Sequence, residues 1–254
     1  MSCIEFQPKR MDHSALQRRI LSADRFTPAA LVVTVLFFLA CGGSGEGPER
    51  PAASGPESFA FFDIGRNSRF SDSLRRELAQ KLGSEAVERR SIIDLESNYK
   101  GFLAAHLPEL DAINRRLNDP PGERVDHGVI KLMYRYARQK NAPFDYVELV
   151  FDGQFRTPLV FRIRFKTDES GLVEALLEKH GSPQAIAWEV ENGQSRVWRK
   201  ERDVLMVSLV PDAFGGIDHQ VIIFFTENLN HWVEFEQTLK QQKSRENLPG
   251  KTAF

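Results

Sequence analysis

Histidine side chains are the first candidates for chemistry in this sequence, because histidine transfers protons near neutral pH and binds metal ions. The chain has six, at positions 13, 106, 127, 180, 219 and 231. No two of them have the four-residue spacing, with an adjacent glutamate, of a zinc site on a helix. The best remaining pair is His219 beside Asp218. We expect no metal site and no cofactor, and we expect His106 and His180 to lie in or beside the core.

The loop that contains this pair, PDAFGGIDH at 211–219, is the second candidate. Asp212 and Asp218 flank two glycines in it, and a calcium loop also combines carboxylates with a glycine turn. The alternating aspartates and the closing glutamate of a calcium loop are missing, however. We favour the simpler interpretation, which is a polar connection between two strands.

Paired carboxylates occur at Asp94 with Glu96 and at Glu109 with Asp111. Residues two apart on a helix point to different faces, so we do not expect either pair to act as a general acid and base. The sequence also lacks the Gly-x-Ser-x-Gly elbow, the Walker loop and the dinucleotide fingerprint. We therefore predict no catalytic residue.

Basic residues form a stripe on the segment 128–140, which we expect to be a helix. Lys131, Arg135 and Arg138 alternate there with tyrosines. The stripe is a candidate contact for nucleic acid, for anionic lipid headgroups or for an acidic partner, and the alternative is a solvated helix face. The formal net charge of the whole chain is −1, so the chain is not basic enough to predict a nucleic-acid partner.

Cys41 ends an apolar run that begins at Ala29 and contains only one polar residue, Thr34. A helix needs about 20 apolar residues to cross a bilayer, whereas a shorter run behind arginines is typical of a signal peptide. An uncleaved anchor and a buried helix are the alternatives. The junction resembles the lipobox of bacterial lipoproteins, although Phe38 and Leu39 depart from its usual residues.

This resemblance implies that Cys41 is acylated and becomes the first residue of the mature protein. Residues 1–40 would then be a signal peptide, with Met11 as an alternative start, and the mature chain would have no other cysteine. Residues 41–58, rich in Gly, Ser and Pro, are expected to form a flexible tether. Gly42 after the cysteine favours the outer membrane, facing the periplasm, within the bacterial cell envelope.

The folded part is expected to be α+β, with a helical layer at 59–141. Residues 59–64 are predicted to form a strand or a hydrophobic clasp. The apolar spacing and the Ser, Pro and Gly signals predict helices, with the following bounds: 71–83, 92–107, 108–118 and 128–140.

From residue 142 to 243, alternating apolar residues predict a mostly antiparallel sheet of about six strands with two helices on one of its faces. The expected order is β-β-α-β-β-β-β-α. Gly153 marks the first hairpin, Asn192-Gly193 marks a second, and the helices cover 169–181 and 228–242. Residues 244–254 are expected to be a disordered tail.

Two functions remain open at this point. The first is a non-catalytic envelope lipoprotein that binds or assembles an envelope protein partner. The second is an anchored hydrolase or ligand-binding protein with its site between the helices and the sheet, in which Arg162 and Arg164 or the loop 211–219 would act. The C-terminal alternation and the turn at 177–183 are similar to small uncharacterised envelope lipoproteins, and that similarity implies no activity.

Overall fold

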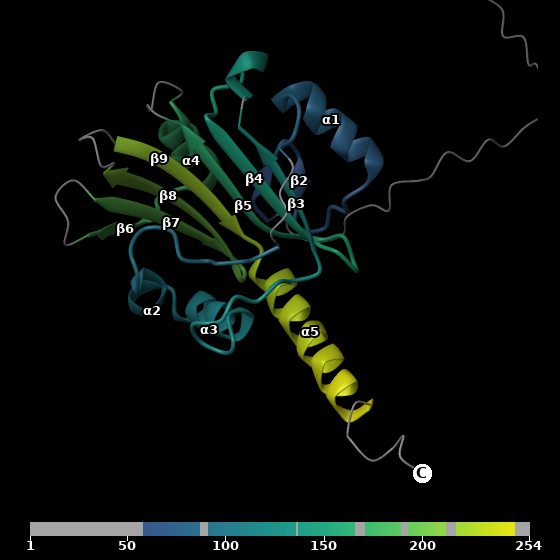
Figure 1. Ribbon diagram of the computed structural model, residues 1–254. Helices are drawn as coiled ribbons and strands as arrows, with labels where there is room; N and C mark the ends of the chain where they lie inside the picture. The colour runs from purple at the N-terminus through teal and green to yellow at the C-terminus, as the bar shows by residue number, and fades with distance from the viewer. Residues whose placement is uncertain are drawn as a thin grey trace, which may run out of the picture. The chain divides into compact units, whose positions relative to one another are not determined.

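A computed structural model describes residues 58–86, 91–135, 137–165, 171–188, 193–211 and 217–246 (Figure 1). The predicted signal peptide, Cys41 and residues 41–57 of the tether lie outside these ranges, as do residues 247–254 of the tail. No helix within the described ranges has the length and apolar character needed to cross a membrane.

An antiparallel sheet of seven strands forms the centre of the fold, in the order β3-β4-β5-β9-β8-β7-β6. Its strands are β3 (Val129–Tyr134), β4 (Tyr146–Asp152), β5 (Pro158–Phe165), β6 (Gln184–Ala187), β7 (Gln194–Lys200), β8 (Asp203–Pro211) and β9 (Ile217–Phe224). A separate hairpin is formed by β1 (Ala60–Phe61) and β2 (Ile64–Gly65). The α+β class is confirmed, and the sheet has one strand more than the expected six.

The helices are α1 (Asp72–Leu82), α2 (Phe102–His106), α3 (Pro108–Leu117), η1 (Ala137–Lys140, a 3₁₀ turn), α4 (Leu172–His180) and α5 (Thr226–Glu246). Helix α1 begins and ends where its caps predict. The Ser71 hydroxyl accepts from the Leu74 amide, and Gly83 ends the helix at a φ of 87°. Helix α4 carries the chain from β5 to the far edge strand β6, from which the last four strands return to β5.

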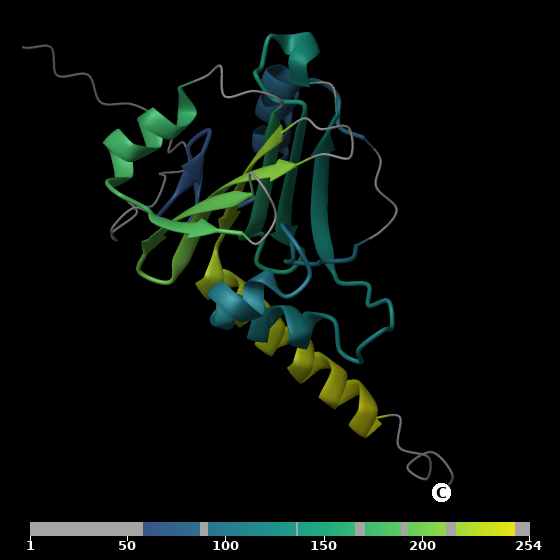
Figure 2. The ribbon, with the colours of Figure 1, turned by 90° about the vertical axis from the view of Figure 1, so that its left-hand side faces the viewer.

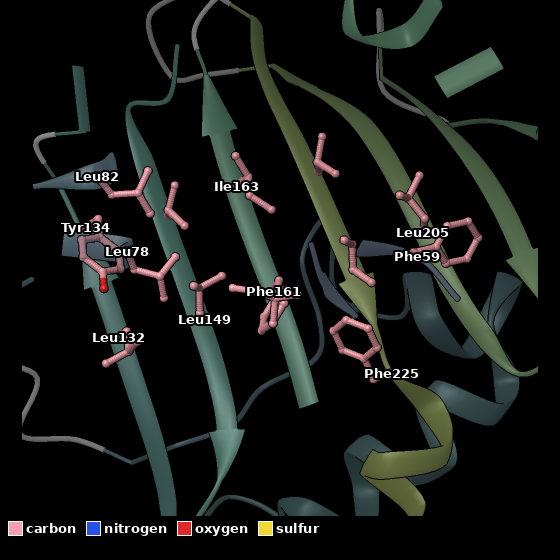
Figure 3. Close-up of a cluster of buried hydrophobic side chains, with 14 of the residues drawn as sticks. Phe59, Leu78, Leu82, Leu132, Tyr134, Leu149, Phe161, Ile163, Leu205 and Phe225 are labelled. Atoms are coloured by element: carbon pink, nitrogen blue, oxygen red, sulfur yellow. The ribbon is translucent and has the colours of Figure 1, made fainter. Parts of the chain in front are cut away.

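Helices cover both faces of the sheet, which corrects the expectation that they share one face. The α1 face packs against α1, α4 and the β1–β2 hairpin, and Figure 3 shows part of this apolar cluster, including Leu78, Tyr134 and Phe161. The α5 face packs against α2, α3 and α5, which lie together in Figure 2. Side chains alternate between the two faces along each strand, and each face carries an apolar cluster of its own.

The helical layer predicted for 59–141 is wrong in two places. Residues 129–134 form the edge strand β3 rather than a helix, with Leu132 opposite Leu149 of β4. The apolar residues of this segment fit a helical repeat, but Ile130, Leu132 and Tyr134 also fit a period of two, and pairing with β4 selects the strand.

The predicted helix 92–107 is also mostly absent. Only residues 102–106 are helical, and Gly101 stands before them at a φ of 91°. Residues 91–97 have no helical turn, and the Leu95 amide donates to the Asn114 side chain instead of to its own segment. At the other end of the chain, α5 covers Thr226–Glu246, whereas the predicted helix covers 228–242 and the predicted tail begins at 244.

Candidate partner-binding surface

Charged and aromatic side chains gather on the α5 face, on the strands β3, β4 and β5 and directly after β3. We call this group the basic strip, and it consists of Lys131, Arg135, Tyr146, Glu148, Arg162 and Arg164. Register explains the grouping, since Tyr146 lies opposite Arg164 and Glu148 lies opposite Arg162. Residues opposite each other on antiparallel strands share a face and touch. The structure thus brings together two sets of basic residues that the sequence suggested separately.

The inner part of the basic strip is an ion pair with an added hydroxyl. The Arg162 guanidinium donates to Glu148 over 2.8 Å, and the Tyr146 hydroxyl donates to the other Glu148 oxygen over 2.8 Å. Only 14% of the Arg162 side chain and 12% of the Glu148 side chain are exposed. Glu148 therefore has a donor on each oxygen, as a buried carboxylate requires.

Burial and neighbouring charges together determine the protonation states of Glu148 and Tyr146. Burial alone would raise the pKa of Glu148, but the positive charges of Arg162 and Lys131 and the two hydrogen bonds hold it below its ordinary value. Burial raises the pKa of Tyr146, and the Glu148 carboxylate raises it further. At neutral pH the strip therefore holds a carboxylate and an un-ionised phenol.

Lys131 and Arg162 also fasten the segment 91–98 to the sheet. The Lys131 ammonium donates to the Ile92 carbonyl over 2.7 Å, and a second nitrogen of Arg162 donates to the Asp94 carbonyl. These two residues were predicted as contact residues, for a partner or at a site between helices and sheet. Their hydrogen bonds give them a structural role within the domain.

The outer part of the basic strip faces solvent. Arg135 and Arg164 are exposed, and the Arg164 guanidinium lies 5.6 Å from the centre of the Tyr146 ring. Arg135 is close enough for its charge to oppose the rise in the pKa of Tyr146. The third predicted residue, Arg138, follows in η1, but its side chain lies outside the described set. Lys131, Arg135 and Arg138 therefore do not form the helical stripe that their spacing predicted.

Farther along the same face, a serine pair forms a second polar group. Ser195 and Ser208 are buried opposite each other, with their hydroxyl oxygens 2.8 Å apart. The Asn98 and Trp188 side chains both donate to Ser195. The serine pair holds Asn98 against the sheet. The sequence did not reveal this pair, because only the pairing of β7 with β8 places the two serines opposite each other.

The histidines do not converge. Each of the five in the described ranges has its own neighbour: His106 with Tyr99, His127 with Glu236, His180 with Phe59, His219 with Phe165 and His231 with Phe155. In the part of the chain with assigned structure, no group of three or more His, Cys, Asp or Glu residues is placed to hold a metal ion. The Asp218 side chain and residues 212–216 of the predicted loop lie outside that part.

The two carboxylate pairs also serve separate contacts. Asp94 accepts from the Glu96 amide and from Asn114, in a segment that is not helical. Glu109, on α3, pairs with Arg202 of the β7–β8 turn. Neither arrangement places two carboxyl groups around a common point.

Comparison of the chain with protein-family models, with curated proteins and with solved structures finds no match in any of the three. The function must therefore be argued from the residues of this chain.

Proposed function

We propose that this protein is a lipid-anchored protein of the bacterial envelope whose folded part is a non-catalytic binding module for an acidic protein partner. The observation that carries the binding role is the division of the basic strip. The side chains of Arg135 and Arg164 are exposed to solvent, whereas those of Lys131, Glu148 and Arg162 are buried or partly buried.

The residue types favour a protein partner over a lipid surface. Arginine and tyrosine are enriched in the centres of protein interfaces, where they combine charge, hydrogen bonding and a large apolar surface. Headgroup-binding segments usually carry about four to eight clustered basic residues. Among the described residues, the exposed members of the basic strip are Arg135 and Arg164. Two arginines are fewer than a headgroup-binding segment usually carries, but they are enough to pair with a few acidic side chains of a protein partner.

The alternative of an anchored hydrolase or small-ligand protein drew on Arg162 and Arg164. Arg162 is bound to Glu148 and to the Asp94 carbonyl, so it is a scaffold for the surface. This arrangement supports binding over catalysis at the basic strip.

The anchor rests on Cys41 and the residues around it. One acyl chain holds a protein to a membrane only weakly, whereas two or more hold it firmly. An acylated Cys41 would therefore keep the domain at the envelope, and Gly42 favours the outer membrane facing the periplasm.

The anchor is tested by intact mass and membrane partitioning of the full chain in a Gram-negative host, beside Cys41→Ala. We expect the wild type to begin at Cys41 with added acyl mass and to sediment with membranes. The mutant should remain unprocessed or lose the acyl mass. An unmodified wild-type chain that still contains residues 11–40 would refute the anchor.

The binding surface is tested by placing a photo-crosslinking residue at Arg164 in living cells, with Gln80 on α1 as the control position on the other face. We expect one acidic envelope protein to crosslink at 164 and not at 80. Arg135→Glu should reduce that crosslink about tenfold or more by charge repulsion, whereas Lys240→Glu on α5 should not. Crosslinking to lipid at 164, or an equal pattern at both positions, would exclude the proposed partner class.

A further inference from the structure

A hollow of about 360 Å³ lies beside α1, on the opposite side of the sheet from the basic strip. We call it the α1 hollow, and it is lined by Arg75, Arg76, Ala79, Ser84, Glu85 and Tyr134. Its volume is at the lower end of the range for small-molecule sites. The lining contains several hydrogen-bond donors, on Arg75, Arg76, Ser84 and Tyr134.

Tyr134 provides the main reason to expect a ligand. Its side chain is wholly buried on the α1 face, at the edge of the cluster that contains Leu78 and Leu82 (Figure 3). Its hydroxyl oxygen has no hydrogen-bond partner among the residues that the structure describes. A buried hydroxyl without a partner is unfavourable for the fold. Because Tyr134 is also one of the residues that line the α1 hollow, its hydroxyl is suited to donate to a group bound there.

The charges of the α1 hollow favour an anion. Arg75 and Arg76 contribute two positive charges, and the one carboxylate of the lining, Glu85, is paired with Arg75. Burial and the Glu85 carboxylate raise the pKa of Tyr134 to about 12, although the charge of Arg75 opposes the rise. The phenol therefore stays protonated at neutral pH and is available as a donor.

We propose that the α1 hollow binds a small carboxylate, with Arg76 and the Tyr134 hydroxyl as its donors. The contact between Arg75 and Glu85 indicates that a carboxylate fits this part of the surface. Ser84 adds a hydroxyl on the turn after α1. The site is independent of the basic strip, because the Tyr134 side chain belongs to the α1 face and the strip to the α5 face.

Isothermal titration of the full chain in a non-ionic detergent tests the proposal. Succinate is the probe, and inorganic phosphate and chloride at matched ionic strength are the comparison arms. We expect saturable binding of succinate that exceeds the binding of phosphate. Tyr134→Phe should weaken it about tenfold, since a hydrogen bond to a charged group is lost, and Arg76→Gln should weaken it at least as much.

Two further variants should change the affinity for succinate differently from Tyr134→Phe: one should raise it and the other should leave it unchanged. Glu85→Gln should tighten succinate binding several-fold, because it removes the negative charge beside the site and releases Arg75. Lys81→Gln removes a positive charge from the same helix but does not line the α1 hollow, so it should leave the affinity unchanged.

Thermal unfolding without succinate separates a binding role from a structural one. Tyr134→Phe should unfold at the same temperature as the wild type or slightly higher, because the removed hydroxyl has no partner. A marked loss of stability would mean that the hydroxyl is structural and would overturn the proposal. So would tighter binding of phosphate, succinate binding that survives both Tyr134→Phe and Arg76→Gln, or no saturable binding of either anion.

Discussion

Glu148 on β4 and Arg162 on β5 face each other across an antiparallel pair, and their side chains form a 2.8 Å ion pair. Arg162 also donates to the Asp94 carbonyl, which belongs to a segment without regular structure. One arginine therefore neutralises a buried carboxylate and fastens a crossing segment to the sheet.

Arg162→Met should destabilise the domain by about 3 kcal/mol, because it leaves the Glu148 carboxylate buried without its main counter-charge. The free energy of unfolding in urea measures this cost. Arg164→Met, on the same strand and face, is the matched control, and it should cost less than Arg162→Met because its side chain is exposed.

The double variant Glu148→Met with Arg162→Met distinguishes a charge effect from a packing effect. When both partners are replaced by apolar residues, the buried charge is removed and much of the lost stability should return. If the double variant is as unstable as Arg162→Met, the loss comes from the Asp94 contact or from packing.

Acid should weaken the domain through Glu148. The pKa of Glu148 is lower in the folded protein than its ordinary value of 4.5, so the folded state binds this proton less well than the unfolded state does. The resulting stabilisation is fully present above about pH 4.5 and is lost as the pH falls through the lowered pKa. Urea unfolding from pH 7 to pH 3 should show this loss in the wild type and a smaller loss in Glu148→Gln.

Local signals in the sequence predicted much of the fold. Ser71 and Gly83 mark the ends of α1 because capping depends only on neighbouring residues. Asn192-Gly193 predicted a hairpin between β6 and β7, and that pairing is present, although residue 192 itself lies outside the described ranges. The turn is not where the dipeptide predicted it, because Ala187 pairs with Gln194 and the Trp188 amide donates to the Gly193 carbonyl. These elements need no knowledge of the rest of the chain.

Elements that depend on distant partners were not predictable in the same way. The segment at 129–134 fits a helical and a strand period, and only its pairing with β4 decides between them. Glu148 and Arg162 become neighbours through register, as do Ser195 and Ser208. The sequence therefore suggested the basic residues of the candidate surface but missed the carboxylate, the phenol and the serines that hold it.

Gly153 was expected to sit in a hairpin connection, and the structure adds a tertiary reason for it. A Cβ atom at this position would lie 2.2 Å from the Gly128 carbonyl oxygen, which accepts from the Gly153 amide over 2.8 Å. Gly153→Ala should therefore destabilise the domain by about 1–3 kcal/mol through steric overlap. Gly128→Ala is the control, since its added Cβ would meet only Trp232, at 3.6 Å. Equal thermal stability of the two variants would contradict the clash.

Asp203 should have the opposite pH dependence to Glu148. Its side chain is wholly buried, and burial raises its pKa above the ordinary 3.8, although the Ser58 hydroxyl and the Arg66 guanidinium oppose the rise. The folded state then holds this proton more tightly than the unfolded state, so its stabilising effect is present below pH 3.8 and is lost as the pH rises through the raised pKa.

Asp203→Asn keeps the shape of the side chain and removes its titration. We expect the variant to gain stability relative to the wild type as the pH rises from about 4, and the difference between their free energies of unfolding measures the gain directly. Arg66 lies 3.7 Å from the carboxylate and also pairs with Glu201 and Glu227. If the variant instead loses stability as the pH rises, attraction to Arg66 outweighs the cost of burying the charge, and the pKa of Asp203 is lowered in the folded state.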